Sequence, residues 1–122
     1  MLERLFHLAD MLDLYGMLLT EKQRRCLELH LFDDFSLSEI GEALGISRQA
    51  ASDMIRRSEQ ALEGCEEKLG LLRRRSVEQA ELAAISAAVE KLRTEDNDAA
   101  VNEVLQHISR LLGTRREVRH DI

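Results

Sequence analysis

The chain has 122 residues, no proline and no tryptophan, and a formal net charge of −6. Its length corresponds to one domain with a modest core, and its abundant leucine, alanine, glutamate and arginine favour helices, because these side chains lose little freedom there. The overall acidity excludes tight, indiscriminate binding to phosphate backbones, so any contact with nucleic acid has to be local.

Two helices are predicted at the N-terminal end of the chain. Apolar residues recur every three or four positions over residues 2–15, which is the spacing of an amphipathic helix, and Gly16 ends or kinks it. Thr20 and Gln23 form a capping-box pattern that opens a second helix. Asp33 and Asp34 are expected to end that helix.

The stretch Leu37 to Met54 matches a helix-turn-helix unit. A second capping box, Ser36 with Glu39, opens a short helix over Leu37–Leu44, and Gly41 allows another helix to approach closely. Gly45 supplies the tight turn, and Ser47 caps the following recognition helix, which begins at Arg48. The positions expected to face the core are Ile40, Leu44, Ile46, Ala51 and Met54.

The recognition helix is expected to continue as a long fourth helix, because an apolar seam at three- and four-residue spacing reaches Leu72. Gly64 and Gly70 favour bending or early termination within it. Ser76 and Gln79 have the spacing of a cap for a further helix, and residues 94–98 form a polar break. A final apolar stripe over residues 101–112 is expected to end at Gly113.

The sequence therefore predicts an all-α protein with a helix-turn-helix core and no wing. We expect a helix-turn-helix domain over residues 1–75, a helical extension over residues 76–113 that packs on it or on a partner subunit, and a disordered basic tail over residues 114–122. The apolar stripes exceed what a four-helix unit buries, which favours a homodimer. The alternative is that the C-terminal helices fold back and close the core within one chain.

The most basic third of the chain contains the recognition helix. Residues 47–76 carry a formal charge of +2, against −5 for residues 1–46 and −3 for residues 77–122. Arginine suits bidentate contacts with guanine or phosphate, and glutamine suits adenine. The alternative is a solvated face on which Asp53 pairs with Arg57. The candidate nucleic-acid-binding residues are Lys22, Arg25, Ser47, Arg48, Gln49, Ser52, Arg56 and Arg57.

Other patterns favour no catalytic, metal or cofactor site. Cys26 and Cys65 lie 39 positions apart without a zinc-binding pattern, the four histidines are scattered, and no glycine-rich phosphate loop occurs. Residues 73–75, three consecutive arginines, suit either a nucleic-acid backbone or the C-terminal end of a helix. No apolar run approaches about 20 residues, so we expect no membrane insertion and a cytoplasmic location with reduced thiols.

Residues 15–72 resemble the YlxM family of bacterial helix-turn-helix proteins, most clearly in LFDDFSLSEI and ISRQA. The motif is also similar to the fourth region of bacterial sigma factors. The resemblance implies a small cytoplasmic regulator that takes part in the signal recognition particle pathway, with DNA or RNA, and components of that particle, as partners. The positions that meet the sigma-factor pattern are Leu19, Thr20, Gln23, Leu29, Ser36, Glu39, Ile40, Leu44, Gly45 and Ser47.

Two functions are therefore open from the sequence. The first is a non-enzymatic regulatory protein that binds nucleic acid through its recognition helix. The second is a protein-interaction adaptor that uses the helix-turn-helix as a scaffold, a function favoured by the net acidity and by Asp53 in the recognition helix.

Overall fold

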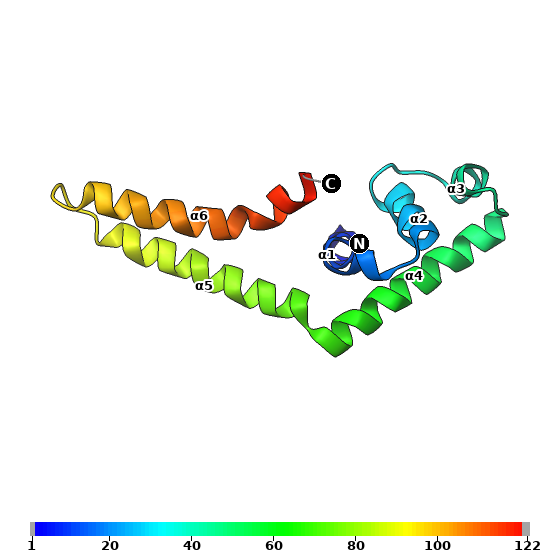
Figure 1. Cartoon of the computed structure of the whole chain (residues 1–122), viewed down its shortest axis with the longest axis horizontal. Coiled ribbons are helices and arrows are strands. Elements are labelled where there is room, and N and C mark those ends of the chain that lie inside the picture. The colour runs from blue at the N-terminus through cyan, green and yellow to red at the C-terminus, as the bar shows by residue number, and fades with distance from the viewer. Residues whose placement is uncertain (1, 121–122) are drawn as a thin grey trace. The chain divides into compact units, whose positions relative to one another are not determined.

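The computed structural model describes residues 2–120, with side chains described for residues 2–113. This part of the chain is helical and contains no strand, which confirms the all-α fold (Figure 1). The chain divides into two compact units at Leu72 and Arg73. The elements are α1 (Leu2–Tyr15), the 3-10 turn η1 (Gly16–Leu18), α2 (Glu21–Leu31), α3 (Leu37–Leu44), α4 (Arg48–Leu69), α5 (Leu71–Lys91) and α6 (Asp98–His120).

The first unit packs α1, α2 and α3 along one side of the long helix α4 (Figure 1). The core is built from amphipathic helices. On α1 the predicted stripe is only partly buried, because Leu2, Leu5 and Phe6 are exposed. Tyr15 and Met11 are the largest of the fully buried side chains. The core residues are Leu8, Met11, Leu12, Tyr15, Cys26, Leu27, Ile40, Ala51, Ile55, Leu62 and Leu72.

The local start and stop signals of the first unit act as predicted. Both capping boxes are complete. The Thr20 hydroxyl accepts the Gln23 backbone N–H, and the Gln23 side chain accepts the Thr20 backbone N–H. Ser36 and Glu39 exchange the same two hydrogen bonds. α2 ends at Leu31, two residues before the aspartates, and Asp34 adopts a left-handed conformation with φ 54°.

Of the two outcomes predicted for the glycines of α4, bending or early termination, the structure shows early termination at Gly70. The helix stops at Leu69, because Gly70 adopts the left-handed conformation, with φ 62°. Gly64 stays inside the helix. α5 then begins at once at Leu71, so the predicted start near Ser76 is wrong.

The reason for this early start lies in two side-chain acceptors, those of the buried Tyr15 and the half-buried Glu66. The Tyr15 hydroxyl accepts the backbone N–H of Leu71 at 3.0 Å, and Glu66 Oε1 accepts that of Leu72 at 2.9 Å. These contacts satisfy helix N–H groups that would otherwise lack partners. The arginines at residues 73–75 consequently lie in the first turns of α5 and not at a helix C-terminus, and Arg74 pairs with Glu78 at 2.9 Å.

The second unit is a hairpin of α5 and α6, which run in opposite directions (Figure 1). Its turn is held by Asn97, which accepts the Thr94 N–H and donates to the Leu92 carbonyl, and by Arg93, which pairs with Glu90 and Asp98. α6 includes Gly113, which lacks the positive φ of a helix-ending glycine, so the predicted stop there is wrong. The predicted disorder of residues 114–122 lies outside the residues with described side chains.

Candidate nucleic-acid interface

The turn between α3 and α4 fixes the start of the recognition helix. A Cβ atom on Gly41 would lie 2.7 Å from the carbonyl oxygen of Ile46, so only glycine permits this approach. The Ile46 N–H donates to the Gly41 carbonyl at 2.9 Å, and Gly45 turns the chain with φ 70°. Gly41 was predicted to allow a close approach of another helix, whereas the nearest segment is the backbone of the turn itself at Ile46 and Ser47.

The inner face of α4 holds the recognition helix against the rest of the first unit. Ala51, Ile55, Ser58 and Leu62 are buried at four- and three-residue spacing. The Cys26 thiol of α2 donates a weak hydrogen bond to the Ala51 carbonyl at 4.0 Å, so α2 crosses α4 about one turn after Arg48. Burial raises the pKa of this thiol. The Ser58 hydroxyl is satisfied by the Met54 carbonyl at 2.7 Å. The opposite face of α4 is thereby directed away from the core.

The outward face of α4 carries the predicted contacts. Arg48, Gln49, Arg56 and Arg57 are exposed, and Ser52 is half-buried. Within the described part of the chain, Arg48 and Arg57 make no hydrogen bond or ion pair. Nine positions separate the two, about half a turn around the helix axis, so the two guanidinium groups flank the outward face and are available for a ligand.

Asp53 organises the other part of this face. Its Oδ1 accepts from Arg56 Nη2 at 3.1 Å and from Gln49 Nε2 at 3.3 Å. The alternative pairing of Asp53 with Arg57 is therefore wrong, because the three-residue step to Arg56 brings the carboxylate and guanidinium together. This pair is solvent-exposed, with 66% of the Arg56 side chain accessible, and therefore weak.

The remaining candidate residues lie at the edges of this surface. The Ser47 hydroxyl caps α4 by accepting the Ala50 N–H at 3.0 Å. Lys22 and Arg25 are exposed on α2, the helix that crosses α4, and no described hydrogen bond links them to Arg48 or its neighbours. The structure thus joins Gln49, Asp53 and Arg56 directly.

The comparisons with known proteins identify the family of this chain. The UPF0122 family, described as "Putative helix-turn-helix protein, YlxM / p13 like", matches residues 2–110. The chain belongs to this family. It is 41% identical over 98 residues to a UPF0122 protein of Thermoanaerobacter sp. (strain X514), covering 80% of this chain and 84% of the relative. It is 42% identical over 105 residues to one of Halalkalibacterium halodurans, covering 86% and 96%. No solved structure matches it.

Other kinds of site are not evident in the described part of this UPF0122 chain. No three histidine, cysteine, aspartate or glutamate side chains gather there in a way that would hold a metal ion. None of the described helices combines the length and apolar character needed to cross a membrane.

The sequence reasoning missed the polar cluster formed by Tyr15 and Glu66. The Tyr15 hydroxyl donates to Glu66 Oε1 at 2.7 Å, and burial together with this carboxylate raises the pKa of Tyr15. Tyr15 was assigned only to an apolar stripe. The position of Glu66 four residues before a helix-ending glycine was the available signal, and it is a weak one.

Proposed function

We propose that this UPF0122 protein binds nucleic acid through the outward face of the N-terminal half of α4. The observation that carries the proposal is the pair of exposed arginines, Arg48 and Arg57, without partners on a helix that the Gly41–Ile46 contact holds in place. A rigidly placed cationic helix face is what insertion into a nucleic-acid groove requires. The family description supports the same function.

The residues of this face have distinct proposed roles. Arg48 and Arg57 bind phosphate or the acceptor edge of guanine. Gln49 donates a hydrogen bond to Asp53, and when this bond opens its amide can pair with the edge of an adenine base. Ser47 and Ser52 supply short hydroxyl contacts, and Lys22 and Arg25 add backbone contacts from α2.

The wider role that we propose is that of a non-enzymatic regulator in the cytoplasm. The resemblance to YlxM proteins supports a place in the signal recognition particle pathway, with DNA or RNA as the bound polymer. Because the net charge is −6, binding depends on this local face and is sensitive to salt.

Asp53 supports a second candidate function, that of a protein-interaction adaptor. Its carboxylate accepts hydrogen bonds from both Gln49 and Arg56 and would repel a nearby phosphate. A targeting-pathway complex recovered by pull-down would survive nuclease treatment if the adaptor function holds. The complex would be lost on nuclease treatment if nucleic acid bridges it.

A mobility-shift assay at two salt concentrations, against duplex DNA and structured RNA, tests the leading function. We expect binding at low salt that weakens at high salt, and substantially weaker binding for Arg48→Ala. Lys68→Ala is the matched control, because Lys68 is an exposed cation on the same helix, about 30 Å from Arg48 along the axis. No binding at low salt, or equal binding by wild type and Arg48→Ala, would reject the function.

A further inference from the structure

In the hairpin, α5 and α6 face each other along one row of less exposed side chains on each helix, which we call the seam. On α5 the less exposed positions are Gln79, Leu82, Ser86 and Val89, and on α6 they are Val101, Leu105, Ile108 and Leu112. Their three- and four-residue spacing is that of two helices packed along their length. Among the described side chains from Arg73 onward, only Val101 and Ile108 are buried, and they remain 6% and 7% exposed.

A second apolar surface lies beside this seam and remains exposed. It consists of Ile85 and Ala88 on α5, Leu92 in the turn that follows α5, and Ala100, Val104 and Leu111 on α6. All of these except Leu92 precede a seam position by one, a register that Glu78, Glu81 and His107 share. The exposed fractions are 45% for Ile85, 67% for Leu92, 43% for Val104 and 61% for Leu111. Because the helices are antiparallel, the same rotation about each axis brings both sets to one face of the hairpin. We call this surface the apolar face.

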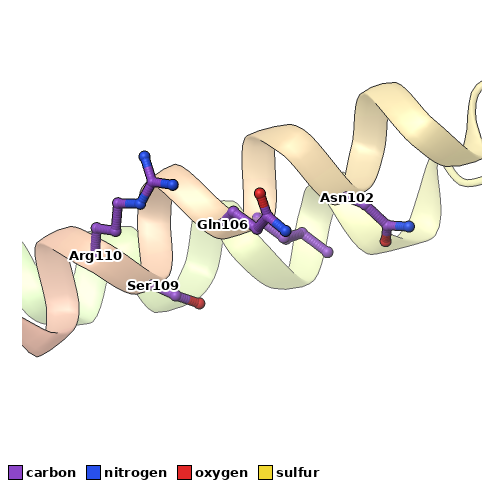
Figure 2. A pocket seen from close by; sticks show the side chains of 5 residues that line it. Asn102, Gln106, Ser109 and Arg110 are labelled. Carbon is purple, nitrogen blue, oxygen red and sulfur yellow. The ribbon is translucent and has the colours of Figure 1, made fainter.

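The opposite face of the hairpin has a different character. The residues that follow the seam positions are Ala80, Ala83, Ala87 and Glu90 on α5 and Asn102, Gln106, Ser109 and Gly113 on α6, all of them small, polar or charged. Asn102, Gln106 and Ser109 line a shallow groove together with Arg110 (Figure 2). The exposed large apolar side chains of the central part of the hairpin are therefore concentrated on one side.

Charge is also separated along the hairpin. At the turn end, residues 90–103 carry five carboxylates against two cations. At the open end, residues 73–78 and 107–113 carry four arginines against one carboxylate. A copy of the same hairpin placed antiparallel would set each acidic end beside a basic end, whereas a parallel copy would set like charges together.

We propose that the apolar face binds the apolar face of a second copy of this chain, in an antiparallel arrangement that forms a four-helix bundle. Leu92 of one copy then packs near Leu111 of the other, and Ile85 and Val104 lie close to the two-fold axis. A two-helix hairpin buries too little apolar surface to be stable alone, and a second hairpin covers the face that is left exposed. This interface does not involve α4 and does not depend on the proposed nucleic-acid binding.

Sedimentation equilibrium with a matched pair of variants tests the interface. Wild type is expected to be a dimer, and Val104→Glu is expected to raise the dimer dissociation constant by at least about tenfold, because a carboxylate would be buried among apolar side chains. Gln106→Glu introduces the same charge on the opposite face of α6 and is expected to leave the dimer intact. Circular dichroism checks that both variants keep their helices. A monomeric wild type, or equal effects of the two variants, would overturn the proposal.

Cysteine crosslinking tests the antiparallel arrangement. In a Cys65→Ser background, a mixture of Leu92→Cys and Leu111→Cys chains is expected to form a disulfide between the two different variants. The Leu92→Cys chain alone is expected to form none, because Cys26 is buried and the two turn ends are far apart. Efficient crosslinking of Leu92→Cys with itself, without the mixed product, would overturn the antiparallel arrangement.

Discussion

At the scale of single residues, Gly41 shows what a sequence can and cannot reveal about this fold. Its place in the motif predicts a close approach, and the structure identifies the approaching atom as the Ile46 carbonyl oxygen. The sequence could not indicate this, because a backbone oxygen five residues away leaves no mark on side-chain spacing. The partners of Asp53 were missed for a related reason, since both the three- and four-residue steps lie within reach on a helix.

Substitution of Gly41 by alanine is expected to destabilise the first unit by about 1–3 kcal/mol, because the added Cβ would collide with rigid backbone. Gly64→Ala is the control. Gly64 lies inside α4 with no atom near its Cβ position, and alanine there is expected to stabilise the protein by about 0.5–1 kcal/mol. Urea unfolding followed by circular dichroism measures both. Equal effects of the two variants would contradict the assigned role of Gly41.

Asp53→Asn is expected to tighten nucleic-acid binding several-fold, corresponding to about 0.5–1 kcal/mol, the coupling of an exposed charge pair. The substitution removes a carboxylate that occupies Arg56 and that would repel phosphate. Fluorescence anisotropy with a labelled oligonucleotide measures the change. Glu67→Gln, at the other end of α4, should leave the affinity unaltered, and weaker binding by Asp53→Asn would count against the proposed face.

At the scale of elements, the starts of α2, α3 and α4 could be predicted because their caps are local. Thr20, Ser36 and Ser47 each bond to a residue three positions ahead. The start of α5 could not be predicted, because it depends on Tyr15, which lies 56 positions from Leu71 in the chain. The end of α6 was misjudged because Gly113 lacks the left-handed conformation that makes a glycine a helix stop.

The junction of α4 and α5 is expected to weaken in Tyr15→Phe by about 1–3 kcal/mol. This variant keeps the buried ring but leaves the Leu71 N–H and Glu66 without the hydroxyl. Thermal unfolding measures the loss of stability, and hydrogen exchange at Leu71 reports local opening. An unaltered exchange rate at Leu71 would show that the hydroxyl does not hold this junction.

The capping box of α3 is expected to make stability depend on acid pH. Hydrogen bonds from Ser36 lower the pKa of Glu39, so at mildly acid pH the unfolded chain binds more protons at this position than the folded chain does. The contribution of Glu39 is therefore complete at neutral pH and disappears as the pH falls through the lowered pKa. Between neutral and acid pH, the free energy of unfolding of Glu39→Gln should lack this contribution, whereas that of Glu42→Gln should keep it. Identical pH profiles for wild type and Glu39→Gln would contradict the mechanism.

At the scale of the whole molecule, helix-forming composition and apolar spacing were enough to predict an all-α chain with a helix-turn-helix. The seam of the hairpin was harder to read, because α5 has apolar residues on every side and its spacing alone does not select one face. The candidate nucleic-acid interface could be predicted in part. Its positions follow from the motif, whereas the availability of Arg48 and Arg57 follows from the folded arrangement.

The salt dependence of nucleic-acid binding is the most direct test of the central claim that the outward face of α4 binds nucleic acid. The slope of the logarithm of the binding constant against the logarithm of salt concentration counts phosphate contacts. The Arg48→Ala, Arg57→Ala double variant is expected to reduce the magnitude of this slope by about 0.7–0.9 for each lost contact, while Lys68→Ala leaves it unchanged. An unaltered slope and affinity in the double variant would contradict the claim.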